Sequence, residues 1–143
     1  MKWLRFKLIH RDARLPVRAT PGSSGMDVFA IEDFYVYSDR IALHATGLQV
    51  EIPEGFELQV RPRSGLVAKE GVTVANAPGT IDSDYRGEIK IMLIKLYPGH
   101  TVILKGDRIA QLVLAEVEEP IIEEATNLTT TSRGSGGFGS TDK

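Results

Sequence analysis

Two carboxylates, a tyrosine and an arginine lie within residues 82–86, inside the stretch 74–89, VANAPGTIDSDYRGEI. A carboxylate within hydrogen-bond reach of a water molecule can take its proton, so Asp82 is a candidate general base for hydrolysis. Such a base contributes about 10²–10⁴-fold to a rate, and positioning and charge stabilisation must supply the rest. The alternative is that Asp82 and Asp84 only cap the turn.

The residues before Asp82 predict a β-hairpin that can present polar groups. Asn76, Pro78 and Gly79 supply the backbone angles of a tight loop between an arm at 72–74 and a second arm at 89–94. A hairpin arm offers N–H and C=O groups in a fixed array, and the Asn76 amide both donates and accepts. Such an array can pair with the edge of a planar base; the alternative is that Asn76 is only a turn residue.

A second stretch has the features of an anion site. Residues 62–65, PRSG, precede a predicted short helix, where free N–H groups, a serine hydroxyl and a flexible glycine attract phosphate. Arg63 could fork onto a phosphate or onto an acidic neighbour. The competing interpretation is an ordinary helix cap.

The glycine-rich end, RGSGGFGSTDK at 133–143, is interpreted in two ways. A Gly- and Ser-rich end is usually a linker, yet Phe138 could stack on a base and Arg133 could meet a phosphate. The stretch superficially resembles a phosphate loop but lacks the lysine and the strand-to-helix setting of that motif. Residues 125–138 span roughly 40 Å when extended, so the end could reach a neighbouring subunit, and the residues alone do not decide between its own chain and a neighbour.

Short strands must position these side chains. Residues 3–9 alternate, with Leu4, Phe6 and Leu8 on one side, which predicts a half-buried strand. Further strands are predicted over 26–30, 34–37, 40–45, 47–53, 56–60, 89–96, 100–104 and 108–117, with 47–53 and 56–60 paired across a reverse turn at 53–55.

One helix is predicted over 65–70, with Ser64 as its N-cap and Gly71 at its end. Many short strands and almost no helical periodicity predict an all-β antiparallel sandwich or barrel over residues 1–124. From Ala125 onward Thr, Ser and Gly dominate, which predicts a flexible C-terminal arm over 125–143 that is mobile when nothing is bound.

Composition narrows the class of protein. A chain of 143 residues suggests one domain. The 17 basic and 19 acidic residues argue against a wide basic surface for nucleic acid and still allow a small phosphate site. Without cysteine there is no disulfide framework and no thiolate metal site. No apolar run approaches the roughly 20 residues of a membrane span and no signal-peptide pattern is present, so we expect a cytoplasmic protein without a membrane partner.

Five motifs in order resemble those of one family. The pattern Asn-x-x-Gly-x-Ile-Asp-x-Asp-Tyr-Arg-Gly at 76–87 resembles the nucleoside-pocket motif of the trimeric dUTPases, the deoxyuridine triphosphate nucleotidohydrolases. SGMDVFA at 24–30, PRSGLVAKEG at 62–71, GDRIAQLVL at 106–114 and RGSGGFGST at 133–141 fit in the same order. The resemblance therefore covers almost the whole chain, with mild departures at Ser24 and Val28.

This resemblance implies a role for each motif. Asp82 is the general base and holds the sugar 3′-hydroxyl, while the ring of Tyr85 packs under the deoxyribose and leaves no room for a 2′-hydroxyl. Asp84 is expected to be structural, paired with Arg86, and Arg108 to support the site or the tail. Nucleoside contacts fall on Asn76, Gly79, Thr80, Ile81, Asp82, Tyr85, Lys90 and Phe138, and phosphate contacts on Arg63, Ser64, Gly65, Gln111, Arg133, Gly139, Ser140 and Thr141.

The implied protein is a distorted jelly roll that cuts dUTP to dUMP and pyrophosphate with Mg²⁺, which Asp27 meets indirectly through water. It is a homotrimer with sites at subunit interfaces, and the glycine-rich end closes as a lid on a neighbouring subunit. Gln111 could instead be a buried glutamine on a strand, and Tyr85 a core residue. Two other functions stay open: a dCTP deaminase of the same fold, and a non-enzymatic jelly-roll module with a disordered tail.

Overall fold

Eleven short strands and one helix form within residues 3–137, the part of the chain that this computed structural model describes. The strands are bounded by turns at Gly, Pro and Asp, as the sequence pattern predicts. They are β1 (Arg5–Leu8), β2 (Met26–Phe29), β3 (Phe34–Tyr37), β4 (Ala42–Ala45), β5 (Leu48–Glu51), β6 (Phe56–Arg61), β7 (Val72–Val74), β8 (Gly79–Ile81), β9 (Lys90–Lys95), β10 (His100–Ile103) and β11 (Arg108–Glu116).

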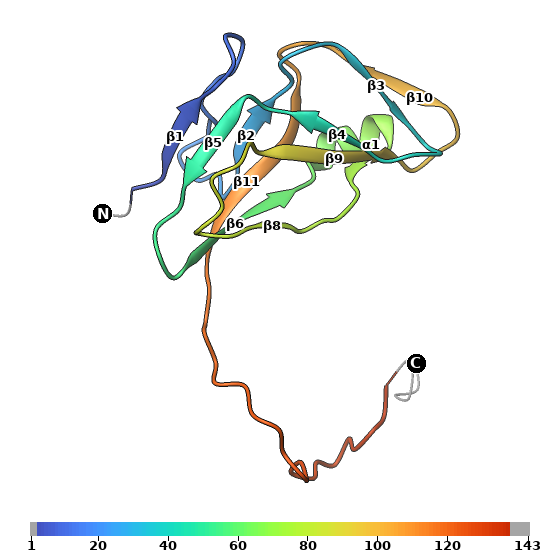
Figure 1. Cartoon of the computed structure of the whole chain (residues 1–143). Helices are drawn as coiled ribbons and strands as arrows, with labels where there is room; N and C mark the ends of the chain where they lie inside the picture. The colour runs from blue at the N-terminus through green and yellow to red at the C-terminus, as the bar shows by residue number, and fades with distance from the viewer. Residues whose placement is uncertain (1–2, 138–143) are drawn as a thin grey trace.

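All strand pairs are antiparallel, and they build a distorted jelly roll (Figure 1). One sheet has the order β2-β11-β6-β8 and a second has the order β4-β9-β7, with the ribbons β1-β5 and β10-β3 beside them. The predicted fold class is confirmed.

The apolar sides of these sheets meet in a single core. Leu58 on β6 and Leu112 on β11 belong to one sheet, Ile91 and Leu93 on β9 to the other, and all four are almost completely buried. Leu4 and Phe6 pack against this core, whereas Leu8 is 45% exposed. The alternation predicted for the first strand therefore holds for its first two apolar residues.

The predicted pairing of residues 47–53 with 56–60 is wrong. The turn itself forms, because the N–H of Phe56 donates to the carbonyl of Pro53. However, β5 pairs with β1, and β6 pairs with β11 and β8. The short connection is a corner where the chain passes from one sheet to another, and turn residues alone do not distinguish a corner from a hairpin.

The predicted hairpin around the candidate base forms in a modified way. Val72 and Val74 on β7 pair with Lys95 and Leu93 on β9, so the two arms are correct. The connecting residues do not fold back as a simple turn, since β8 lies within them and pairs with β6 of the other sheet. The loop therefore bridges the two sheets, which gives it support from both sides.

The helix α1 (Ser64–Glu70) starts one residue earlier than expected. Its N-cap is Arg63, which makes no side-chain cap bond, so the prediction of Ser64 as N-cap is wrong. Gly71 ends the helix with a φ of 66°, and its N–H donates to the carbonyl of Val67. A Cβ at Gly71 would lie 2.5 Å from the ring of Tyr97, so both backbone conformation and space require glycine there. At seven residues α1 is far too short to cross a membrane, and it is the sole helix in the described part of the chain.

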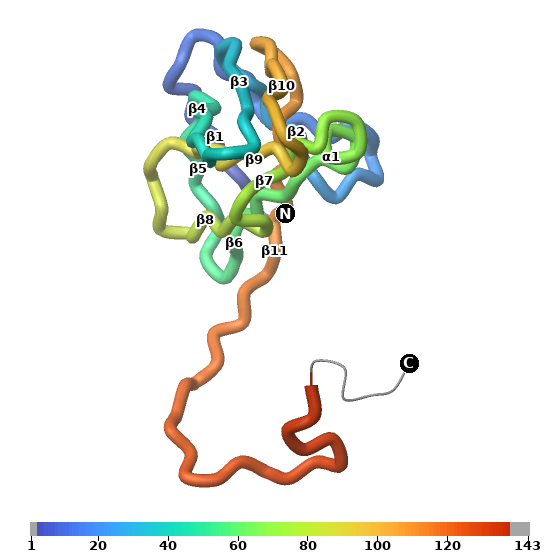
Figure 2. Tube along the Cα trace, turned by 90° about the vertical axis from the view of Figure 1, so that its right-hand side faces the viewer, coloured from blue at the N-terminus to red at the C-terminus, as the bar shows by residue number. Residues whose placement is uncertain are grey.

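After β11 the chain leaves the barrel. The N–H of Val117 donates to the carbonyl of Gly55, the last backbone bond to the barrel before residues 118–137 run outward (Figure 2). Ile121 and Ile122 are 94% and 93% exposed. Further along, the Nε of Arg133 donates to the carbonyl of Gly136 in a local turn.

Candidate active site

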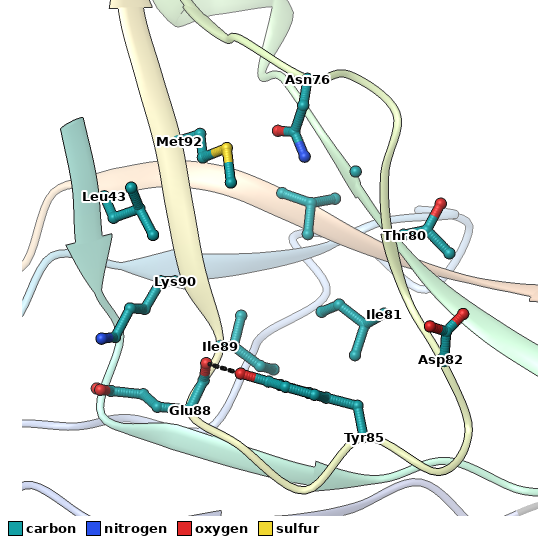
Figure 3. A pocket seen from close by; sticks show the side chains of 12 residues that line it. Leu43, Asn76, Thr80, Ile81, Asp82, Tyr85, Glu88, Ile89, Lys90 and Met92 are labelled. Carbon is teal, nitrogen blue, oxygen red and sulfur yellow. Dashed lines mark hydrogen bonds between the residues drawn. The ribbon is translucent and has the colours of Figure 1, made fainter. Parts of the chain in front are cut away.

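The bridging loop between β7 and β9, which contains β8, borders a cavity of about 240 Å³ (Figure 3). Its walls come from both sheets, because β8 and Val60 of β6 line one side, and residues of β4 and β9 line the other. The lining residues are Leu43, Val60, Asn76, Gly79, Thr80, Ile81, Asp82, Tyr85, Glu88, Ile89, Lys90 and Met92. Every nucleoside-site residue predicted within the described chain is in this set.

Asn76 is positioned by a close approach to Gly79. A Cβ at Gly79 would lie 3.1 Å from the Nδ2 atom of Asn76 and 3.2 Å from the Cβ of Val60. Gly79 thus allows the amide to lie over the start of β8. Because β8 is the edge strand of its sheet, only one of its two sides is occupied by β6, and its other polar backbone groups remain for a ligand.

Asp82 and Tyr85 lie on the same loop. Asp82 follows the last residue of β8, and its carbonyl accepts a hydrogen bond from the N–H of Tyr85 at 3.1 Å. The carboxylate of Asp82 is exposed and lines the cavity. The ring of Tyr85 lies across the cavity, and its hydroxyl donates to the carbonyl of Glu88 at 3.0 Å (Figure 3).

Asp84 does not pair with Arg86, so this expectation is wrong. The guanidinium of Arg86 instead donates from Nη1 to the carbonyls of Ser83 and Tyr85, at 2.6 and 3.0 Å. Gln49 adds a bond from its Nε2 to the carbonyl of Arg86 at 2.9 Å. The arginine therefore holds the loop through its backbone, and a loop whose carbonyls face one guanidinium needs no carboxylate partner for it.

A second cavity, of about 320 Å³, contains the predicted phosphate residues. Asp27 lines this cavity, is buried and lies between two guanidinium groups. The Nε of Arg63 donates to one carboxylate oxygen at 3.1 Å, and Nη1 of Arg108 donates to the other at 3.0 Å. Arg63 also donates to the carbonyl of Arg108 at 3.0 Å. This cluster joins β2, β11 and the residue that precedes α1.

Gln111 on β11 is held at the same cavity. Its Nε2 donates to the carbonyl of Pro62 at 2.9 Å, and a Cβ at Gly25 would lie 2.0 Å from its Oε1. The glutamine side chain therefore lies directly on the Gly25 backbone. Ser64 and Gly65 line the cavity as well, so all four phosphate-site residues expected on the barrel lie together.

The chain's own residues offer an outer position for a divalent cation. No group of three or more His, Asp or Glu side chains that could hold a metal ion occurs within residues 3–137. Each oxygen of Asp27 accepts one arginine N–H, and a carboxylate oxygen retains a further lone pair that a metal-bound water could use. The donor set thus fits a hydrated ion met through water and does not fit an ion bound by protein ligands alone.

The described residues of the glycine-rich end, 133–137, line neither of these cavities. Arg133 lies on the outward segment and lines neither of them. The predicted residues Phe138, Gly139, Ser140 and Thr141 lie outside the described residues.

Several lining residues are absent from the sequence-based prediction. Leu43 and Met92 form the apolar side of the first cavity and are register partners on β4 and β9. Only the strand pairing could have shown this, because they are far apart in sequence. Glu88 also lines the cavity; its signal was its place in the 74–89 motif.

A comparison of the sequence with known protein families finds the family that the five motifs resemble. The dUTPase family model matches residues 11–142. The chain belongs to the dUTPase family. The family resemblance seen in the five motifs is thus confirmed.

Individual dUTPases are similar over nearly their whole length. The deoxyuridine 5′-triphosphate nucleotidohydrolase of a Hydrogenobaculum species is 51% identical over 140 residues, covering 96% of each chain. That of Rickettsia felis is 51% identical over 137 residues, covering 94% of this chain and 93% of the other. The solved structure of the Staphylococcus bacteriophage 80alpha dUTPase with dUPNHPP has a TM-score of 0.87 and 28% identity, covering 99% of both chains.

Proposed function

We propose that this chain hydrolyses dUTP to dUMP and pyrophosphate, with Asp82 as the general base that activates water for attack on the α-phosphate. Membership of the dUTPase family supports the reaction. The observation that carries the site assignment is that Asp82, Tyr85 and Asn76 line one cavity beside the edge strand β8. In this proposal Asp82 is the base, the ring of Tyr85 meets the sugar, and Asn76 with β8 provides the hydrogen-bonding edge for the pyrimidine.

In this proposal β8 and Asn76 read the uracil. The outer edge of Gly79, Thr80 and Ile81 offers backbone donors and acceptors, and Lys90 on β9 adds its backbone from the opposite wall. A site built to hydrogen-bond one edge can discriminate by about 10⁴–10⁵, because the wrong base leaves buried polar groups unpaired. The ring of Tyr85 forms the floor under the deoxyribose.

The triphosphate extends to Arg63, Ser64, Gly65 and Gln111. Arg63 lines the phosphate cavity and is paired with Asp27, and its guanidinium group can offset phosphate charge. Arg108 supports this arrangement through its own pair with Asp27. Asp27 would meet a hydrated Mg²⁺ through water, and the ion would offset charge on the phosphate oxygens.

A homotrimer completes the site in this proposal. The nucleoside and phosphate cavities share no lining residue, which suits a nucleotide bound across a subunit boundary. The outward course of residues 118–137 (Figure 2) suits a lid that closes on a neighbour. Arg133 and the end of the chain, including Phe138, Gly139, Ser140 and Thr141, then cover the nucleotide and its phosphates.

The test is pyrophosphate release from dUTP in the presence of Mg²⁺, with Asp82→Asn beside the wild type. Asn keeps the shape and removes the base, so turnover should fall at least about 100-fold while nucleotide binding persists. The matched control is Asp84→Asn, on the same loop but outside the cavity lining, which should keep most of the activity. Near-wild-type turnover of Asp82→Asn would refute the assignment of the base.

A dCTP deaminase would release ammonia from dCTP, so the same preparation should be assayed for that product. Ammonia release without pyrophosphate would replace the proposed reaction. A chain that binds dUTP and releases neither product would be a nucleotide-binding module.

A further inference from the structure

We propose that Gly87 and Glu88 are positioning residues that fix the ring of Tyr85 and so set the preference for 2′-deoxyribose over ribose. This inference rests on the proposed function. Neither residue needs to touch the substrate for this role; both act through the tyrosine. Three sets of contacts carry the inference.

The first is the approach of the ring to Gly87. A Cβ built on Gly87 would lie 2.3 Å from the hydroxyl oxygen of Tyr85, 2.4 Å from Cζ and 2.9 Å from Cε2. Cβ atoms essentially never come that near, so the ring lies directly on the glycine backbone. Gly87 is not among the glycines with positive φ, so space rather than backbone conformation accounts for glycine here.

The second is the double attachment of Glu88. Its carbonyl accepts the Tyr85 hydroxyl at 3.0 Å (Figure 3), and its Oε1 accepts the N–H of Gly47 at 2.9 Å. Gly47 is buried between β4 and β5, and its carbonyl accepts the N–H of Ile9 at 2.8 Å. A charge-assisted bond of this kind is roughly twice as strong as a neutral one, so Glu88 links the ring to a fixed part of the barrel.

The third is the fixed position of the residue that follows. The hydroxyl of Thr46 donates to the carbonyl of Ile89 at 2.7 Å, and the N–H of Ile89 donates to the carbonyl of Leu48 at 2.8 Å. The end of the loop is therefore attached to the β4–β5 turn by both its backbone and Glu88. Hydrogen bonds to a rigid barrel leave the ring little freedom to yield to a larger sugar.

Rigidity decides how strongly a wall can exclude one hydroxyl. An apolar pocket by itself rejects an added hydroxyl by only about 10²-fold. The hydroxyl end of the ring lies against the Gly87 backbone and is hydrogen-bonded to Glu88, so the ring cannot recede in that direction. The exclusion of a 2′-hydroxyl then becomes steric. Loosening either support should therefore lower the ratio of kcat/KM for dUTP to kcat/KM for UTP.

The experiment measures that ratio for Gly87→Ala and for Gly22→Ala. Gly22 has no heavy atom within 4 Å of a built Cβ, which makes it a matched glycine control. We expect Gly87→Ala to lower the ratio by about tenfold or more, toward the roughly 10²-fold discrimination of an apolar pocket, mainly through changes in KM. Gly22→Ala should leave the ratio unchanged. A wild-type ratio in Gly87→Ala would overturn the role of Gly87.

A second pair of variants keeps the test independent of how Gly87→Ala folds. Glu88→Ala removes the acceptor for Gly47, whereas Glu88→Gln retains an oxygen in the same place. The ratio should fall several-fold in Glu88→Ala, because this variant loses one charge-assisted bond. In Glu88→Gln the ratio should be close to that of the wild type. Equal ratios in the two variants would overturn the role of Glu88.

The proposed function and this inference fail in different ways. If wild-type protein releases no pyrophosphate from dUTP, the function is wrong. The positioning of Tyr85 is then tested by calorimetric binding of dUMP and UMP to the same variants, and an unchanged preference in Gly87→Ala overturns it. If dUTP is hydrolysed and the ratio does not respond to either substitution, only the inference is wrong.

Discussion

Asp27 lies between two guanidinium groups, and its contacts define what the residue can do. The carboxylate is 12% exposed as a side chain, and each oxygen accepts from a different arginine. Removing one charged partner of such a cluster leaves the charge of the others without a compensating opposite charge. At the scale of the single residue, Asp27 therefore orients Arg63 at the phosphate cavity and holds Arg108 beside it, in addition to any contact with a hydrated ion.

Asp27→Asn should weaken both stability and substrate use. Losing the carboxylate charge should lower the free energy of unfolding by about 1–3 kcal/mol, and misplaced arginines should raise the KM for dUTP. Urea unfolding and initial rates at several Mg²⁺ concentrations measure the two effects. The matched control is Asp39→Asn, whose pair with Arg40 is exposed on both sides and should change stability by less than about 1 kcal/mol. Wild-type stability of Asp27→Asn would contradict the account.

At the scale of the element, β4 carries both a wall of the nucleoside cavity and a half-buried histidine. Leu43 lines the cavity, and the next residue, His44, stacks on Phe34 of β3 with ring centroids 3.6 Å apart. Within residues 3–137 the buried Nε2 of His44 has no hydrogen-bond partner. Burial lowers the pKa of His44, and the carboxylate of Glu32 acts in the opposite direction. Protonation of this ring is thus unfavourable in the folded state.

This lowered pKa predicts an acid-sensitive stability. A histidine in the unfolded chain has a pKa of about 6.5. Below that pH the unfolded chain therefore binds more protons than the folded one. The stability contributed by neutral His44 is complete above that pH and is lost as the pH falls through the lower folded pKa. Urea unfolding at about pH 7.5 and 5.5 should show a smaller decrease for His44→Phe than for wild type. The control is His100→Gln, at an exposed histidine on β10, which should leave the wild-type decrease in place.

At the scale of the whole molecule, the barrel and the outward segment act as separate parts. The buried core residues all lie between Ala13 and Leu112, while residues 118–137 make no part of the core. Deleting residues 133–143 should therefore leave the unfolding transition and the oligomer size unchanged. Activity should fall strongly, since the lid residues are gone. A deletion variant with normal dUTP hydrolysis would show that the end has no role in catalysis.

The proposed trimer gives a sharper test by complementation. Asp82→Asn and the 133–143 deletion are each expected to be inactive as pure proteins. If one subunit supplies the base and another the lid, trimers refolded from an equal mixture should have about a quarter of their sites intact. If base and lid come from the same chain, the mixture should remain inactive. Light scattering before mixing establishes whether the protein is a trimer.

The local sequence was sufficient for some features because they depend on neighbouring residues. Turn residues such as Gly71, the alternation of apolar residues, and the ordered motifs predicted the strands, the helix end and the dUTPase family. The clustering of Asp82 and Tyr85 followed from their place on one loop. These features need only backbone preferences and side-chain types, which the sequence contains directly.

Contacts between distant residues were decided by the tertiary structure alone. The separation of β5 from β6, the passage of β8 to the other sheet, and the pairing of Asp27 with Arg63 and Arg108 all depend on which apolar faces become buried together. Burial is a property of the whole chain, and a short turn is compatible with either a hairpin or a corner. The same reason explains why the space at Gly87 that receives the Tyr85 ring became visible only in the folded protein.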